Sequence, residues 1–95
     1  MKNWFVYILI CADESFYIGY TSDLQKRISE HNIGRGAQHT YVRRPVKLVY
    51  QEIYDNKEDA LKRESQLKKW SRDKKKALID QDPAKLKNLS KRKNP

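Results

Sequence analysis

The sequence has little of what disulfide-bonded, zinc-binding or membrane proteins need. Cys11 is its one cysteine, so no internal disulfide can form and no zinc-type cysteine spacing exists, which favours a reducing compartment. The apolar run near the N-terminus is too short to span a membrane, and no small-residue cleavage site of a signal peptide follows it. We therefore expect a cytoplasmic protein without a membrane partner, and leave association with the nucleoid open.

Length and charge narrow the class of protein further. The 95 residues suit one small domain, and the sequence shows no internal repeat and no second domain. Lysine and arginine number 21 against 12 acidic residues, for a formal net charge of +9 at pH 7. So much positive charge on a small domain favours a polyanionic partner, most often nucleic acid; a protein that merely happens to be basic is the alternative.

Three apolar segments predict strands. Residues 4–11 form a continuous run rich in aromatic and β-branched residues, which indicates a central strand buried on both faces. Residues 16–20 follow after a polar break, so the two segments are predicted to form a hairpin. Residues 46–54 are predicted to form a third strand. Its apolar face carries Val46, Leu48 and Tyr50, which alternate with Lys47, Val49 and Gln51.

Helices are predicted between and after these strands. Ser22 and Gln25 have the spacing of a capping box, so a helix should begin near Asp23 and end at the glycines of residues 34 and 36. A second helix is expected over residues 57–70, with Asn56 or the aspartate before it as its cap. A third should start at Ser71 and run to residue 79.

The predicted order is therefore strand, strand, helix, strand, helix, helix. This order gives an α/β (α+β) fold in which flanking helices pack on a small three-stranded sheet. We assign residues 1–82 to this one domain. Residues 83–95 begin with a proline, are basic and carry few large apolar side chains, so we expect a disordered, mobile tail.

Glu64 occupies a position that is unusual for a carboxylate. It lies four residues after Ala60 and three before Leu67, on the expected buried stripe of its helix. An unpaired carboxylate there is costly, so we expect a cation or hydrogen-bond donors beside it. A partly exposed glutamate at the edge of the stripe, paired with a nearby lysine or arginine, is the alternative.

Arg27 and His31 are spaced four residues apart, so their side chains should meet on one face of a helix. The arginine offers a fork of donors to a phosphate, and the histidine can transfer a proton near neutral pH. For either residue alone, a solvated side chain near a helix end is the more ordinary explanation.

Tyr7 and Tyr17 lie in the two strands of the predicted hairpin. Each alone is most simply a packing residue. A simple four-residue loop over residues 12–15 would pair Tyr7 with Tyr20 and place Tyr7 and Tyr17 on opposite faces. For Tyr7 and Tyr17 to share a face, the loop must have an odd length or one strand must bulge.

Further basic residues are candidates for contact with nucleic acid. A solvated helix face and a strip that binds the nucleic-acid backbone explain the lysines equally well, and His39 alone is a weak signal. The candidates lie in the basic loop of residues 35–45 and in the last predicted helix: Arg35, His39, Arg43, Arg44, Lys74, Lys75 and Lys76.

Taken together, these residues resemble the GIY-YIG nuclease superfamily, most closely its small single-domain bacterial members of the excinuclease C-like type. The resemblance covers roughly residues 3–79. It rests on a specific set of short motifs: Val6-Tyr7, Tyr17-Ile18-Gly19, Thr21, Asp23-Leu24, Arg27, His31, and Ala60 with Glu64.

The resemblance implies an endonuclease or nickase that cleaves phosphodiester bonds in DNA with one Mg²⁺ or Mn²⁺ ion, in DNA repair or processing. Glu64 would hold the metal and Arg27 would bind the scissile phosphate. Tyr7 and Tyr17 would line the site, and one of them would help to activate or position the attacking water. His31 matches a position that is histidine in part of the superfamily.

Two departures from the superfamily pattern accompany this resemblance. The first motif reads Phe5-Val6-Tyr7, without its leading glycine and isoleucine, and Tyr20 stands where many relatives have lysine. A non-catalytic nucleic-acid-binding module and an interaction subunit that recruits a repair protein remain the alternatives. The sequence does not indicate the oligomeric state.

Overall fold

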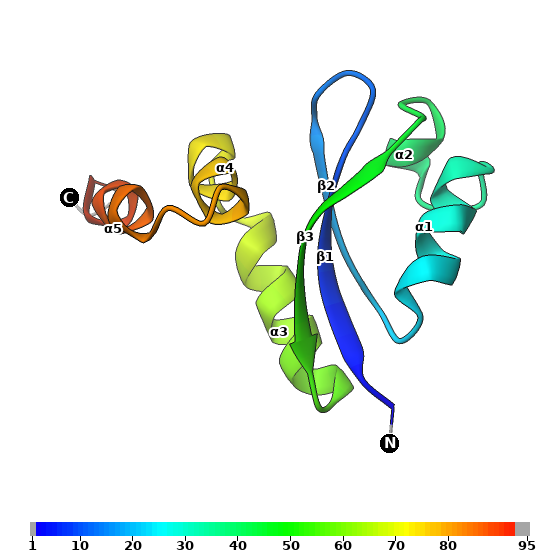
Figure 1. The fold of residues 1–95 in the computed structure, drawn as a ribbon, viewed down its shortest axis with the longest axis horizontal. Coiled ribbons are helices and arrows are strands. Elements are labelled where there is room, and N and C mark those ends of the chain that lie inside the picture. Colours follow the sequence, from blue (N-terminus) through cyan, green and yellow to red (C-terminus); the bar gives the residue numbers. More distant parts are fainter. Residues whose placement is uncertain (1, 93–95) are drawn as a thin grey trace.

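A three-stranded antiparallel sheet forms the centre of the molecule. The computed structural model describes residues 2–92, and its strands are β1 (Trp4–Ile10), β2 (Phe16–Thr21) and β3 (Lys47–Tyr54), in the order β2-β1-β3. Figure 1 shows β1 between its two neighbours. Residues 6–9 of β1 are buried on both faces, so the prediction of a central strand in a small sheet with flanking helices is confirmed.

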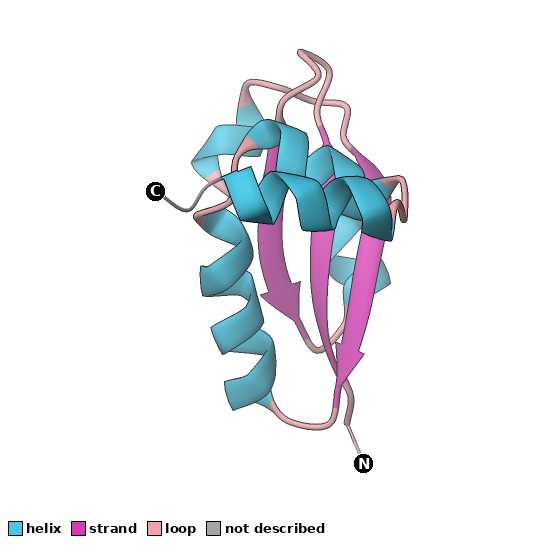
Figure 2. Cartoon of the chain, turned by 90° about the vertical axis from the view of Figure 1, so that its left-hand side faces the viewer, coloured by secondary structure: helices cyan, strands magenta, loops and turns pink. Residues whose placement is uncertain are grey.

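Helices cover both faces of this sheet. Helices α1 (Leu24–Asn32) and α2 (Gln38–Tyr41) lie on one side, and α3 (Lys57–Lys68) lies on the other (Figure 1). Beyond α3 follow α4 (Arg72–Ile79) and α5 (Pro83–Arg92), and Figure 2 shows the C-terminal helices crossing in front of the strands. Within residues 2–92, no helix has the length and apolar character needed to cross a membrane.

The alternation of side chains along β1 divides the core into two clusters. Val6 and Ile8 pack with Ile18 of β2 and with buried residues of α3. Tyr7 and Leu9 point to the opposite face, where they pack with apolar side chains of α1. Each fully buried aliphatic side chain stabilises the fold by about 1.5–3 kcal/mol, so the two clusters together fix both helices on the sheet.

Helices α1, α3 and α4 begin at capping side chains, although one cap differs from the prediction. Asp23, and not Ser22, caps α1, because its carboxylate accepts a hydrogen bond of 3.2 Å from the backbone N–H of Lys26. The predicted capping box is therefore wrong by one residue. Asn56 caps α3 and Ser71 caps α4, as predicted.

Two helices lie where the sequence predicted none. Helix α2 lies inside the basic loop, and α5 occupies residues 83–92, where we expected a mobile tail. Asp82 explains the second difference, because its carboxylate accepts a hydrogen bond of 3.1 Å from the N–H of Lys85 and so caps α5. Pro83 then takes the first helical position, where proline is favoured rather than disruptive. The prediction for residues 93–95 falls outside the described residues.

Candidate active site

The register of the hairpin brings the two tyrosines to one face. Ile10 pairs with Phe16, so the connection consists of the five residues 11–15, an odd number. Tyr17 is consequently opposite Leu9, two residues along the strand from Tyr7, and the two tyrosine rings lie 6.4 Å apart. The sequence predicted that the two tyrosines can share a face only if the loop has an odd length or a strand bulges. The structure has the odd loop length.

Gly19 leaves the space into which Tyr7 extends. The two residues are opposite each other in the hairpin, and a Cβ atom at position 19 would lie 2.6 Å from Cζ of Tyr7. Tyr7 is 1% exposed and has little room to move away. A glycine is therefore needed here for the tyrosine ring to cross over β2, the edge strand, toward the rim of the sheet.

A cavity of about 340 Å³ opens at this rim. Tyr7 of β1, Tyr17 of β2, Arg27 of α1 and Glu64 of α3 all line it. The structure thus brings together four of the five predicted catalytic residues from four different elements. A larger hollow of about 650 Å³ lies along the outer side of α3 and contains none of them.

Arg27 and Tyr7 form the polar side of the cavity. Arg27 is held by an ion pair of 3.2 Å with Glu30, one turn further along α1, and its side chain is 32% exposed. Burial raises the pKa of Tyr7 to about 12, although the neighbouring Arg27 guanidinium acts in the opposite direction. The Tyr7 hydroxyl is therefore protonated at neutral pH and presents a hydrogen-bonding group rather than a negative charge.

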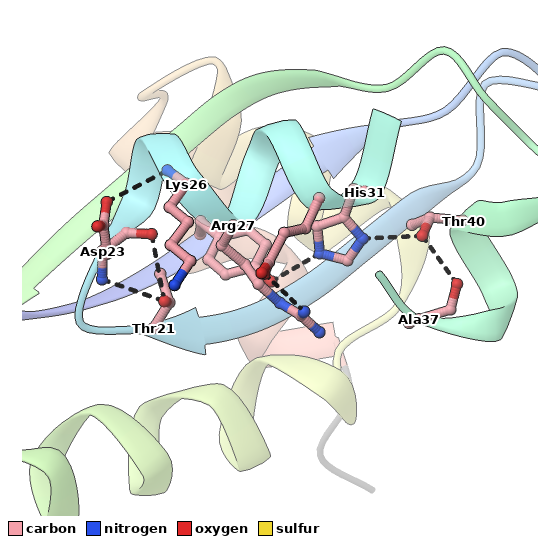
Figure 3. Close-up of polar contacts among 9 residues, drawn as sticks. Thr21, Asp23, Lys26, Arg27, His31, Ala37 and Thr40 are labelled. Carbon is pink, nitrogen blue, oxygen red and sulfur yellow. Dashed lines mark hydrogen bonds and ion pairs between the residues drawn. The ribbon is translucent and has the colours of Figure 1, made fainter. Parts of the chain in front are cut away.

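His31, the fifth predicted residue, lies behind Tyr7 and is fully buried. Its Nε2 atom is 2.9 Å from the Tyr7 hydroxyl oxygen. Its Nδ1 atom is 2.8 Å from Oγ1 of Thr40 (Figure 3). Burial, assisted by the positive charge of Arg27, lowers the pKa of His31 to about 4. The sequence suggested a group that titrates near neutral pH, whereas the structure holds a neutral imidazole at that pH.

Gly36 makes room for this imidazole. A Cβ atom at position 36 would lie 2.6 Å from Cγ and 2.8 Å from Cα of His31. Because the second of these atoms is backbone, a side chain at position 36 would displace the end of α1 itself. The glycine therefore allows the chain to return close to the histidine.

Glu64 combines the two alternatives that the sequence left open. It is 7% exposed, as expected for the buried stripe, and forms an ion pair of 3.2 Å with Lys68, whose side chain is 53% exposed. Within residues 2–92, no group of three or more histidine, cysteine or acidic side chains could hold a metal ion. A single carboxylate at an open cavity still fits Mg²⁺, which commonly keeps several waters and takes other ligands from substrate phosphates.

Part of the predicted nucleic-acid-binding set lies on the α2 side of the sheet. His39 stacks on Tyr17 with ring centroids 5.9 Å apart, and so lies beside the cavity. Arg35 and Arg44 are exposed. Arg43 is bound by an ion pair of 2.9 Å to an aspartate of the hairpin connection, so its charge is partly neutralised.

The lysines of α4 lie on the opposite side of the sheet (Figure 1). Lys74 has its Nζ atom 4.2 Å from the centroid of the Trp70 ring, and Lys76 pairs with Asp80 at 3.1 Å. Burial lowers the pKa of Lys75. These lysines therefore form a separate basic group that does not border the cavity.

Sequence reasoning missed two polar clusters. Thr40 lies in a segment read as an irregular loop, and nothing in its neighbours marks it. A second carboxylate, Glu52 of β3, accepts hydrogen bonds from the hydroxyls of Tyr50 and Tyr54 and is 2.9 and 3.0 Å from two nitrogens of Arg63. The alternate spacing of these three β3 residues was a usable signal, because it places a glutamate between two tyrosines on one face of a strand.

Comparison with known proteins finds one catalytic-domain model and several similar proteins. Residues 3–77 match the model of the GIY-YIG catalytic domain. A UPF0213 protein of Staphylococcus saprophyticus is 52% identical over 81 residues, which cover 85% of this chain and 99% of that protein. A UPF0213 protein of Staphylococcus aureus is 53% identical over 79 residues, or 83% of this chain and 96% of that one.

Two solved structures show the same fold. The UPF0213 protein BH0048 of Bacillus halodurans has 42% sequence identity and a TM-score of 0.56, covering 84% of this chain and 85% of its own. The protein EF2693 of E. faecalis has 35% identity and a TM-score of 0.59, covering 85% and 86% of the two chains. The match to the catalytic-domain model over most of the chain, together with these relatives, shows that the chain belongs to the GIY-YIG family.

Proposed function

We propose that this protein is an endonuclease or nickase that hydrolyses phosphodiester bonds in DNA, in repair or processing, with one Mg²⁺ or Mn²⁺ ion held at Glu64. The observation that carries the proposal is the convergence of Tyr7, Tyr17, Arg27 and Glu64 on one cavity. A packed core has no need for a guanidinium, a carboxylate and two tyrosines at a single opening. Hydrolysis of a phosphodiester uses a cation, a metal ligand and a group that positions water.

Arg27 is the group that binds the scissile phosphate. Its guanidinium offers several fixed N–H donors, and the ion pair with Glu30 holds the side chain in place before substrate arrives. The phosphorus gains negative charge on its oxygens as water attacks. A donor that is already oriented toward those oxygens lowers the barrier, because it needs no reorganisation at the moment of reaction.

Tyr7 positions the attacking water and passes on its proton. With a pKa of about 12, Tyr7 does not act as a preformed phenolate. The water oxygen forms the new bond to phosphorus and gives its proton to the Tyr7 oxygen, while Tyr7 gives its own proton to Nε2 of His31. The leaving oxygen departs with the electron pair of the broken bond, and Tyr17 lines the other side of the water.

Glu64 supplies the anchor for the metal ion. A divalent ion held by this carboxylate would supply Lewis-acid chemistry to the substrate phosphate. The carboxylate suits this role because it is buried, borders the cavity and is neutralised in this structure by a solvent-exposed lysine that can move away. If a metal ion replaced Lys68 beside Glu64, the lysine ammonium would be solvated by water, and this solvation would offset the loss of the ion pair.

The exposed arginines beside α2 are the proposed contacts for the DNA backbone next to the cavity. Arg35 and Arg44 are both exposed there, and the Arg44 guanidinium donates to backbone carbonyls. His39 borders the site through Tyr17. Lys75 and its neighbours on α4 are then a second, weaker contact. DNA affinity should fall steeply with salt, by a log–log slope of roughly −0.9 for each phosphate contact on duplex.

The test is the Glu64→Gln variant in a nicking assay on supercoiled plasmid with Mg²⁺ or Mn²⁺. We expect the rate to fall by orders of magnitude because the amide no longer holds the metal, while DNA binding and thermal stability stay close to those of the parent. Glu58→Gln is the matched control, since it removes one negative charge from an exposed position of the same helix. Equal nicking by parent and Glu64→Gln would contradict the proposal.

One observation favours a second candidate, a nucleic-acid-binding module without catalysis. The Glu64–Lys68 ion pair provides a cation for the buried carboxylate without any metal. In that case the parent nicks no DNA, and neither Mg²⁺ nor Mn²⁺ changes its melting temperature, whereas the salt-dependent DNA affinity remains. Melting the parent with and without metal therefore separates the two candidates.

A further inference from the structure

Thr40 connects the candidate active site to the short helix α2. It is fully buried, as is His31. Its Oγ1 atom is 2.9 Å from the carbonyl oxygen of Ala37 and 2.8 Å from Nδ1 of His31 (Figure 3). The other imidazole nitrogen, Nε2, is 2.9 Å from the hydroxyl of Tyr7. Three hydrogen bonds thus link a backbone carbonyl to the tyrosine that lines the cavity.

The chemistry of the donors sets the direction of this chain. A carbonyl oxygen only accepts, and a threonine hydroxyl has one hydrogen. Two oxygens at 2.9 Å attract each other only if the hydroxyl hydrogen lies between them, so Thr40 donates to Ala37. Its oxygen then accepts a hydrogen bond from His31, which places the single proton of the neutral imidazole on Nδ1.

The other end of the chain agrees with this direction. With its proton on Nδ1, His31 presents an unprotonated Nε2, and Tyr7 must donate to it. The Arg27 guanidinium, which only donates, lies beside the same Tyr7 hydroxyl and opposes the rise of its pKa. The tyrosine oxygen can therefore accept from the guanidinium side while its hydrogen points to the histidine.

We propose that Thr40 is a positioning residue that fixes the Nδ1–H tautomer of His31 and thereby keeps Nε2 open as the proton acceptor for Tyr7. Without the Thr40 oxygen, the imidazole can carry its proton on Nε2 instead. His31 would then donate to Tyr7, and Tyr7 could no longer pass its proton away from the cavity. The catalytic consequence rests on the proposed function; the tautomer does not.

Packing around the imidazole opposes a flip of the His31 ring. Ring rotation by half a turn would exchange the positions of the two nitrogens, but the close approach of Gly36 to Cγ and to the backbone of His31 leaves little space around the ring. The burial of both His31 and Thr40 also keeps water from replacing the hydroxyl. The threonine therefore acts as the one orienting group for Nδ1 within the described residues.

The first test reads the tautomer directly, by ¹⁵N NMR of the histidine rings at neutral pH. The chain has only two histidines, so the Gln variant of either one assigns the spectrum. We expect a protonated Nδ1 and an unprotonated Nε2 for His31 in the parent and in Thr40→Ser. Thr40→Val, which keeps the shape but loses the hydroxyl, should show a mixture or the reversed tautomer. A protonated Nε2 in the parent, or an unchanged tautomer in Thr40→Val, would overturn the proposal.

The second test measures nicking by the same variants, well below their melting temperatures. Loss of the group that orients a metal-binding histidine costs about 10–100-fold in metal affinity or activity. By analogy we expect a loss of the same order for Thr40→Val, and recovery of most of it in Thr40→Ser. A Thr40→Val rate equal to the parent's, with the tautomer changed, would overturn the positioning role. A parent that nicks no DNA but shows the expected tautomer would overturn the proposed function and its catalytic use of Thr40, and leave the tautomer assignment standing.

Discussion

Two neighbouring residues of α3 reach opposite edges of the sheet. Arg63 turns toward β3 and meets Glu52, whereas Glu64 turns toward β2 and lines the cavity. Glu52 is saturated, because two tyrosine hydroxyls and the Arg63 fork all donate to it. Glu64 has one ion pair, to a half-exposed lysine. Glu52 is therefore suited to a structural role, whereas Glu64 can still bind a ligand.

The tyrosines at the two edges of the sheet have similar pKa values but different hydrogen-bond partners. Burial raises the pKa of Tyr7, Tyr50 and Tyr54 alike, in each case to about 12. The raised pKa therefore does not mark the reactive tyrosine. The surroundings of the hydroxyls differ instead. Tyr50 and Tyr54 donate to the Glu52 carboxylate, which Arg63 also holds, whereas Tyr7 lines the cavity and contacts a neutral imidazole.

Exchange of an arginine for glutamine at each edge should give the largest difference. Arg27→Gln should lower the nicking rate by about 10²–10³-fold, because a charged donor to the transition state is lost, with little effect on stability. Arg63→Gln should leave the rate of the folded protein unchanged and lower its melting temperature. Initial nicking rates and thermal melts of both variants provide the check. The comparison fails if Arg27→Gln nicks at the parent rate.

The two carboxylates should differ clearly in their contribution to stability. Glu52→Gln removes the charge that three groups share, and should lower the free energy of unfolding by about 1.5–3 kcal/mol. Glu64→Gln should change it by less than about 1 kcal/mol, since its ion pair is with an exposed lysine. Urea unfolding of both variants measures this directly. Equal losses would mean that Glu64 is structural.

The stability that His31 contributes and the stability that Glu52 contributes should be lost in different ranges of pH. Folding lowers the pKa of His31 from 6.5 to about 4, so the unfolded chain binds more protons between these values. Stability from this group is complete above pH 6.5 and falls as the pH falls toward 4, by at most about 1.4 kcal/mol per pH unit.

The Glu52 cluster acts at lower pH. Burial raises the pKa of Glu52, but hydrogen bonds from Arg63 and the tyrosines more than offset this, and the net pKa lies below its usual 4.5. Its contribution is therefore lost only as the pH falls below that range. Stability of the parent and of His31→Gln, compared between pH 6.5 and 5, isolates the histidine. Parallel curves for the two proteins would contradict the assignment of its pKa.

Lys68→Ala should have the smallest effect. Its ion pair with Glu64 is largely solvated on the lysine side, and such pairs contribute about 0–1 kcal/mol. Urea unfolding should therefore barely change, in contrast to the loss of Arg63 at the other edge. A loss of several kcal/mol would show that Lys68 is the required counter-ion of the buried carboxylate, and would favour the non-catalytic module.

Much of the fold could be predicted because its signals are local. The apolar run of β1 and the buried stripe of α3 follow from the side-chain period alone. Helix α5 was missed because Pro83 was read as a terminator, although a proline after a capping aspartate also begins helices. Short helix α2 has too few residues to show any period.

The candidate site could be predicted only in part, for a physical reason. Tyr7, Tyr17, Arg27 and Glu64 are recognisable from motif spacing. The partners that hold them are not, because Thr40 reaches His31 only after the chain folds back past Gly36. The same holds for Arg63 and Glu52, which the packing of α3 on the sheet brings into contact.

The register of the β1–β2 hairpin has a consequence for how this protein can change by insertion and deletion. Removal of one residue that keeps Ile10 opposite Phe16 shortens the connection to four residues and leaves both faces unchanged. A slip of the pairing by one residue would instead move every side chain of β2 to the other face, so that Ile18 and Tyr17 would exchange environments. The turn is also tied by Asp13 to Arg43 and by Ser15 to His39. Length variants that keep this pairing should therefore retain the cavity, and those in which the pairing slips by one residue should keep a sheet but lose the cavity.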